Sequence, residues 1–114
     1  MTALLEQIAH ARSGDKGAHS NVGVVFFDRR VYDWAVGWLT PERVKRHFQR
    51  IALGGVKRYE LPNLLALNFI LEDSLGGGGS LSLKSDAQGK THGQAMLRME
   101  VELPAELADC VEVI

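Results

Sequence analysis

The sequence predicts an α+β fold in which helices cover one face of an antiparallel sheet. Continuous apolar runs rich in β-branched and aromatic residues at 22–27 and 67–71 are typical of buried strands. A helix start signal, the "TPE" at 40–42, lies between these two runs. Strands therefore alternate with helical segments along the chain, and such elements bury their apolar sides when the helices pack on the sheet.

Length and composition indicate one small globular domain spanning 1–114. The chain has 114 residues, enough to bury an apolar core, and its one cysteine excludes an internal disulfide. The formal net charge of -1 gives no general attraction to nucleic acid or membranes. No run approaches the ~20 apolar residues of a membrane helix, and the N-terminus lacks the basic start of a signal peptide. We therefore expect a cytoplasmic protein.

The N-terminal third is predicted to hold two strands and a short helix. Residues 3–11 alternate loosely between apolar and polar side chains and favour a first strand. A polar loop over 12–21 then separates this strand from the buried strand at 22–27. Trp34 and Trp38 stand at i and i+4, which places both indoles on one face of the helix that follows.

A second helix has the clearest start signal in the sequence. Thr40 is a good N-cap, Pro41 suits the first helical position, and Glu42 lies in the positive first turn. The pattern continues to about Ala52. A basic stripe on this helix is either a solvated face or a surface that grips an acidic partner or the phosphates of a nucleotide-bearing cofactor. The stripe comprises Arg43, Arg46, His47 and Arg50.

The second half of the chain predicts two more strands and a further helix. Residues 56–61 and 67–71 favour strands, joined by a turn at "PNLLA". A helix over 87–97 followed by a strand is favoured next, although the period-two alternation over 91–103 fits a hairpin strand. The order of elements fits a ferredoxin-like antiparallel sheet with helices on one face, plus one extra N-terminal strand.

Several catalytic motifs are excluded. The "GKT" at 89–91 resembles the end of a phosphate-binding P-loop, but that motif needs glycine at position 84, where the chain has Lys84. No CxxC or HExxH occurs, and Cys110 has no adjacent histidine to lower its pKa. Without a complete triad, metal set or dinucleotide motif, the sequence does not decide whether the protein is an enzyme, and it predicts no cofactor.

The polar segment "ARSGDKGAHSN" is the first candidate site. Gly14 and Gly17 permit positive φ, so successive backbone N–H groups can form an anion-binding nest. Arg12 and Lys16 would add positive charge, and Asn21 would fix the loop or a ligand. Asp15 would act as a base or hold Lys16 in place. The alternative is an exposed polar turn between two strands.

Two further segments have unusual polar or glycine content. Asn68 lies in an otherwise apolar strand, where a buried amide needs hydrogen-bond partners, and Asn63 suits the turn after Pro62. Asn68 either contacts a ligand or bonds to a neighbouring loop. A run of four glycines would wrap a phosphate or serve as a mobile linker. The run comprises Gly76, Gly77, Gly78 and Gly79.

Four segments together resemble a known family. "AHARSGDKG…N.GV", "RYELPNLLALNF", "LGGGGS" and "DAQGK" are similar to the small ferredoxin-like domain of the acyclic terpene utilisation (AtuA) family, over roughly residues 4–103. In that family the domain is either the C-terminal part of a longer protein or a separate chain beside a large subunit. The family pattern holds Arg12, Ser13, Gly14, Asp15, Lys16, Gly17, Asn21, Tyr59, Glu60, Pro62, Asn63, Asn68, Gly76, Gly77, Gly78, Gly79 and Lys90.

The resemblance implies a role in the breakdown of branched, acyclic terpenoid acids as CoA thioesters. We expect the chain to dock on a large AtuA-like subunit and to complete a site for an acyl-CoA-like ligand. Arg12, Lys16 and the backbone N–H groups of 14–17 would bind an anionic group, with Asp15 as a general base. The alternative is a homo-oligomeric interaction module that buries the apolar faces around Trp34, Trp38 and the sheet.

Overall fold

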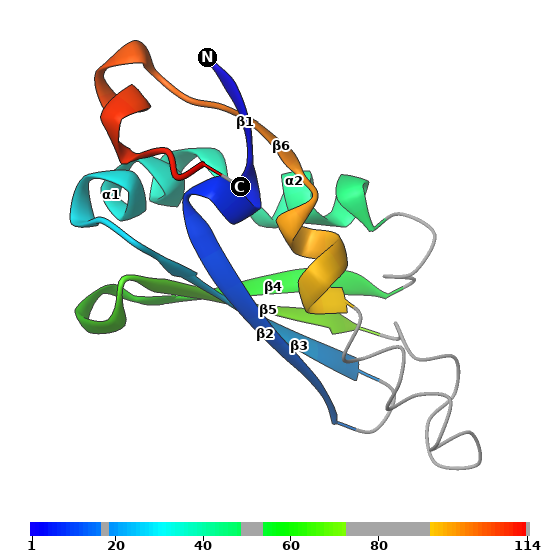
Figure 1. Ribbon diagram of the computed structural model, residues 1–114. Helices are drawn as coiled ribbons and strands as arrows, with labels where there is room; N and C mark the ends of the chain where they lie inside the picture. The colour runs from blue at the N-terminus through cyan, green and yellow to red at the C-terminus, as the bar shows by residue number, and fades with distance from the viewer. Residues whose placement is uncertain (17–18, 49–53, 73–91, 114) are drawn as a thin grey trace.

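The computed structural model describes residues 1–16, 19–48, 54–72 and 92–113 (Figure 1). Residues 92–97 are helical. Among the described residues, no helix has the length and apolar character needed to cross a membrane. The remaining elements are β1 (Thr2–Leu4), η1 (Leu5–Gln7), β2 (Ala9–Lys16), β3 (His19–Phe26), α1 (Arg29–Trp38), α2 (Pro41–His47), β4 (Gly55–Leu61), η2 (Pro62–Leu64), β5 (Ala66–Glu72), β6 (Glu100–Glu102) and η4 (Ala105–Cys110).

A four-stranded antiparallel sheet forms the centre of the fold. Its strand order is β2-β3-β5-β4, and every neighbouring pair is antiparallel. Because β5 lies between β3 and β4, those two strands run parallel to each other and enclose α1 and α2 in a split β-α-β unit. This arrangement confirms the predicted ferredoxin-like α+β fold with helices on one face.

The last strand lies outside the main sheet. β6 pairs antiparallel with β1 in a separate two-stranded ladder, in which Ala3 is opposite Val101. In the main sheet, the strand at the edge beside β3 is β2 and not β6. The N-terminal segment therefore contributes two strands, one to each sheet, where the sequence predicted one.

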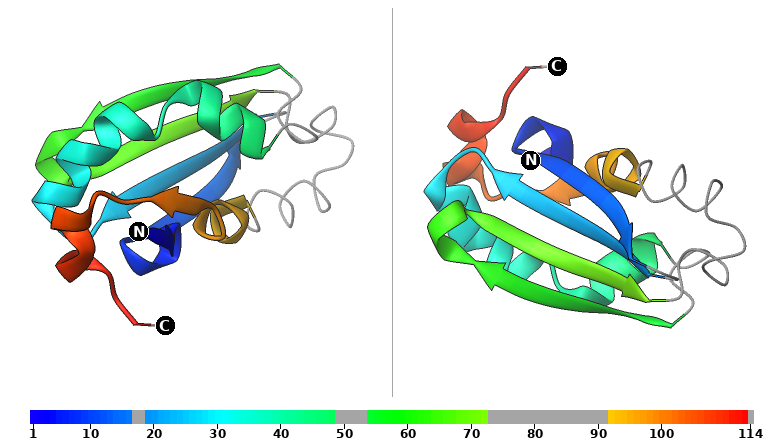
Figure 2. Two further views of the ribbon diagram at one scale, coloured as in Figure 1. Left: turned by 90° about the horizontal axis from the view of Figure 1, so that it is seen from above. Right: turned by 90° about the horizontal axis from the view of Figure 1, so that it is seen from below.

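One face of the main sheet is buried and the other is open. Figure 2 shows α1 and α2 on one side of the sheet, and the view from below shows the strands in front of α2. Alternate residues of β3 and β5 point into the helical layer, where they are fully buried. The core consists mainly of Val22, Val24, Phe26, Leu67, Phe69, Leu71, Val31, Tyr32, Ala35, Leu39, Val44, Phe48, Met96 and Met99.

Arg58 fixes the end of α1 on the sheet. It lies on the inner face of β4, and its Nη1 donates to the carbonyl oxygens of Val36 at 2.7 Å and Leu39 at 3.0 Å. These carbonyls belong to the last turn of the helix, where intrahelical partners run out and positive charge is favoured. The Arg58 side chain is only 15% exposed, so the contact is well shielded.

The predicted start of α2 is confirmed. The side chain of Thr40 accepts a hydrogen bond from the Arg43 N–H at 3.2 Å, with Pro41 in the first turn of α2. Val44 and Phe48 are buried, as the apolar stripe predicted. α2 is described as far as His47, so the predicted continuation to Ala52 lies outside the described residues.

Two predicted element boundaries are wrong. Residues 12–16 and 19–21 are not a loop, because they extend β2 and β3 into one long hairpin. Ser13 and Ser20 are small enough to face the helical layer in these strand ends, whereas Arg12 and Asn21 face solvent on the other side. Residues 3–11 are not one strand, because η1 interrupts them.

The described part of the third predicted helix supports a helix rather than a hairpin strand. Residues 92–97 are helical, with Met96 buried, and the strand resumes only at β6. The alternation of apolar and polar residues over 91–103 therefore does not correspond to a strand at residues 92–97. Residues 87–91 of the predicted helix lie outside the described residues.

Candidate functional site

The β2–β3 hairpin carries most of the candidate residues, and strand alternation divides them between two faces. Arg12 pairs with Gly23, and Ser13 pairs with Val22. Val22 is buried in the core, whereas Arg12 is exposed, so Ser13 and Arg12 lie on opposite faces of the sheet. These two residues therefore do not converge on one ligand.

The predicted nest is wrong at Gly14. This residue pairs with Asn21 within the ladder, and among the described residues Gly14 has no positive φ. Successive N–H groups of a strand point in opposite directions, so they do not form a concave anion site. The second glycine of the predicted nest, Gly17, lies outside the described residues.

The open face presents a cross-strand row made of Arg12, Gly23, Asn68 and Tyr59. The register places Arg12 opposite Gly23, Gly23 opposite Asn68, and Asn68 opposite Tyr59. A Cβ on Gly23 would meet only Asn68 Oδ1 at 3.7 Å and the Arg12 carbonyl at 3.9 Å, both ordinary contacts. Glycine is therefore not required by packing, and its lack of a side chain leaves a gap between Arg12 and Asn68.

The other candidates are dispersed or lie outside the described residues. Asn21 is exposed on the same face as Arg12, nearer the hairpin end. Asn63 lies in η2, at the opposite end of the sheet (Figure 1), so the structure does not bring it to the hairpin. Asp15 and Lys16 occupy the register positions opposite Ser20 and His19. Gly76, Gly77, Gly78, Gly79 and Lys90 lie outside the described residues.

On the inner face, Ser13 holds the start of the 92–97 helical segment. The Gly93 N–H donates to Ser13 Oγ at 2.9 Å, across 80 positions of sequence. This hydrogen bond joins β2 to the 92–97 segment. A Cβ on Gly93 would lie 3.0 Å from Ser13 Oγ, which explains glycine at this position.

Ser20 and His92 form a buried polar pair beside this contact. His92 Nδ1 lies 2.9 Å from Ser20 Oγ, and the two residues are 3% and 1% exposed. The Phe48 ring packs against the imidazole with centroids 5.8 Å apart. Burial lowers the pKa of His92, because the charged imidazolium loses its hydration. The imidazole is therefore neutral at pH 7.

The Ser20–His92 pair has the contact of a serine nucleophile with its base. Both groups are shielded from solvent, so in this arrangement they join the hairpin to the helical layer rather than meet a substrate. Among the described residues, no group of three His, Cys, Asp or Glu side chains is placed to hold a metal ion.

Sequence reasoning missed Ser20, His92 and Gly93. Ser20 belonged to a segment assigned as a loop, and His92 stood alone among scattered histidines. One available signal was Gly93 in the middle of the predicted helix, because a glycine with poor helix propensity often marks close packing.

The family model described as AtuA ferredoxin-like domain matches residues 3–102. The match covers the main sheet, both helices and the β1–β6 ladder. No curated protein and no solved structure matches the chain.

Protonation of His92 is expected to destabilise the fold at mildly acidic pH. In the unfolded chain the His92 imidazole binds a proton with the ordinary pKa of about 6.5. In the folded chain burial lowers this pKa, so fewer protons are bound at the same pH. The free energy of unfolding therefore falls as pH drops below about 6.5, by up to about 1.4 kcal/mol per pH unit for one proton. Urea unfolding from pH 7.5 to 5 measures this slope. His92→Gln should flatten it, and an equal slope in that variant would contradict the assignment.

Ser13 and Gly93 are expected to be energetically coupled. Ser13→Ala removes the hydrogen bond to the Gly93 N–H and should cost about 1 kcal/mol of unfolding free energy. Gly93→Ala forces a methyl group against Ser13 and should cost about 1–3 kcal/mol. In the double variant the hydroxyl is absent, so the loss should be smaller than the sum. Additive losses would show that the two residues do not meet in solution.

Proposed function

We propose, because the chain belongs to the AtuA ferredoxin-like domain family, that it is the small subunit of a two-part AtuA-type assembly. It docks on a separate large subunit through the open face of its sheet. The substrate class implied by the family is the branched, acyclic acyl-CoA thioesters. The chain completes the partner's ligand site instead of forming a whole active site alone.

The distribution of exposed apolar side chains carries this proposal. Among the described residues, two exposed large apolar side chains, Met1 and Val113, lie near the chain ends. The others gather on the open face or on the adjoining η2 turn. They are Phe27, Tyr59, Leu61 and Leu64, with exposures of 45%, 52%, 42% and 64%. Exposed apolar side chains on a sheet face that the described helices leave uncovered favour a protein interface.

The row beside this cluster supplies polar recognition. Arg12 and Asn68 lie about two strand spacings apart, roughly 10 Å, with the gap over Gly23 between them. The guanidinium of Arg12 can donate charge-assisted hydrogen bonds to a carboxylate or phosphate group beside this gap. Lys16 lies farther along β2 at a register position of the same face as Arg12, whereas Asp15 lies at a position of the opposite face.

Docking is expected to depend on Tyr59. Tyr59→Asp places a charge in the apolar cluster and should weaken capture of the large subunit at least tenfold, since exposed aromatic residues dominate interfaces. The assay is co-expression of the tagged chain with the AtuA-type large subunit of the same genome, followed by affinity capture. Val113→Asp is the matched control, because it adds the same charge at a site that is 97% exposed.

Circular dichroism confirms that both variants fold before capture is compared. Equal capture by the Tyr59 variant and the parent chain would refute docking through this face. A chain that purifies alone as a tight homo-oligomer, and is made monomeric by Tyr59→Asp, would instead assign the face to a second copy of itself.

Ligand binding by the assembly is expected to depend on Arg12. Arg12→Gln removes the exposed positive charge beside the Gly23 gap and should weaken 3-methylbutanoyl-CoA binding by about tenfold. Isothermal titration of the purified two-subunit complex measures the dissociation constant. Lys57→Gln is the control, because Lys57 is exposed on the same face of β4 but outside the row. Equal effects of the two variants would exclude a specific role for Arg12.

A further inference from the structure

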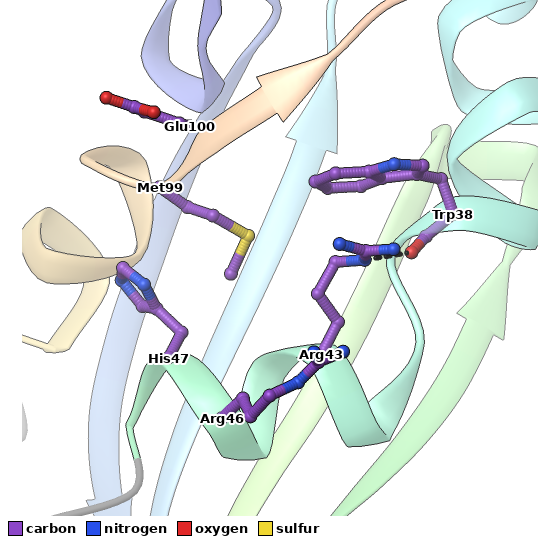
Figure 3. Close-up of a pocket in the computed structure, with 6 residues that line it drawn as sticks. All are labelled: Trp38, Arg43, Arg46, His47, Met99 and Glu100. Carbon is purple, nitrogen blue, oxygen red and sulfur yellow. Dashed lines mark hydrogen bonds between the residues drawn. The ribbon is translucent and has the colours of Figure 1, made fainter.

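An open hollow lies in the helical layer, on the side of the sheet away from the open face. It encloses about 430 Å³ between the end of α1, α2 and the segment leading into β6. Figure 3 shows side chains from all three elements around it. This volume falls within the range of small-molecule sites. The lining residues are Trp38, Arg43, Arg46, His47, Met99 and Glu100.

Arg43 is held in place on one wall of the hollow. Its guanidinium carbon lies 4.0 Å from the centre of the Trp38 ring, and its Nε donates to the Trp38 carbonyl at 2.9 Å. Trp34 stacks on Trp38 with centroids 5.2 Å apart, which fixes the indole in turn. Within the described part of the chain, the Nη atoms of Arg43 donate to no protein group, so they are available to a ligand.

Arg46 adds a second positive charge one helical turn later. Positions 43 and 46 are neighbours on the helix surface, where like charges repel. Neither arginine forms an ion pair with a residue that the structure describes. Two adjacent arginines that form no ion pair within the described part of the chain favour an anion from outside.

The remaining lining residues are the apolar Met99 and the polar His47 and Glu100. The Met99 side chain points toward the indole and guanidinium groups (Figure 3). His47 Nε2 lies 2.8 Å from the Ala95 carbonyl oxygen, which ties α2 to the 92–97 segment. Glu100 is the one carboxylate on the lining, and its side chain extends away from Arg43 in Figure 3.

We propose that this hollow binds a small organic anion, with its carboxylate or phosphate group on Arg43 and Arg46 and a short apolar body against Met99 and Trp38. The guanidinium forks supply charge-assisted hydrogen bonds, and the thioether and indole exclude water from the apolar part. The site is separate from the open sheet face, so it is independent of the proposed docking role.

Tryptophan fluorescence provides a direct test, because the chain has two tryptophans and both belong to the Trp34–Trp38 stack. Three probes are titrated into the isolated chain: hexanoate, the neutral hexanamide and inorganic phosphate. Hexanoate should give a saturable change in emission. Hexanamide should bind at least tenfold more weakly, because it lacks the charge, and phosphate should also bind more weakly, because it lacks the apolar body.

Variants locate the binding. Arg46→Gln should weaken hexanoate binding about tenfold, whereas Lys45→Gln, which removes an exposed charge of the same helix outside the hollow, should change it less than twofold. Glu100→Gln should strengthen binding about twofold, a gain that misfolding would not produce. Absence of a saturable response to hexanoate, equal binding of hexanamide, or equal losses in the Lys45 and Arg46 variants would overturn the proposal.

Discussion

Strand alternation in the β2–β3 hairpin is the constraint on which the arrangement of polar groups depends. Because successive side chains face opposite sides, one short segment supplies both the exposed Arg12 and the inward Ser13. The inward residues then hold the 92–97 segment, through Gly93 and through the Ser20–His92 pair. The outward residues lie on a face that neither α1 nor α2 covers. The polar segment that the sequence predicts as one site is therefore divided between two faces of the sheet. Its inward residues contact the 92–97 segment, and its outward residues are exposed.

Much of the fold could be predicted because its signals are local. The apolar runs in β3 and β5 and the Thr40–Pro41 start of α2 each depend on neighbouring residues only. The hairpin end was mistaken for a loop, since glycine and charged residues favour turns unless a partner strand pairs with them. The pairing of β6 with β1, outside the main sheet, joins residues far apart in the sequence, so no local pattern indicates it.

The candidate site was less predictable than the fold, for a similar reason. The sequence indicates Asn68 by its apolar neighbours and Tyr59 by the family pattern. Only the strand register shows that both lie in one row with Arg12. Asn63 was grouped with them by sequence proximity, yet η2 places it at the other end of the sheet. His92 meets Ser20 across 72 positions. A lone histidine has no spacing pattern, so its buried, neutral state follows from the tertiary structure alone.

The two faces of the molecule are suited to different kinds of partner. The open face is broad, with exposed aromatic and aliphatic side chains beside a polar row, and this favours another protein surface. The hollow in the helical layer is small and positively charged, and Arg43 is already oriented by Trp38, so little conformational entropy is lost when an anion binds. Because the sheet separates the two, a protein bound to the open face leaves the hollow accessible. Arg58, which ties the end of α1 to β4, gives the helical layer and the sheet a fixed relation.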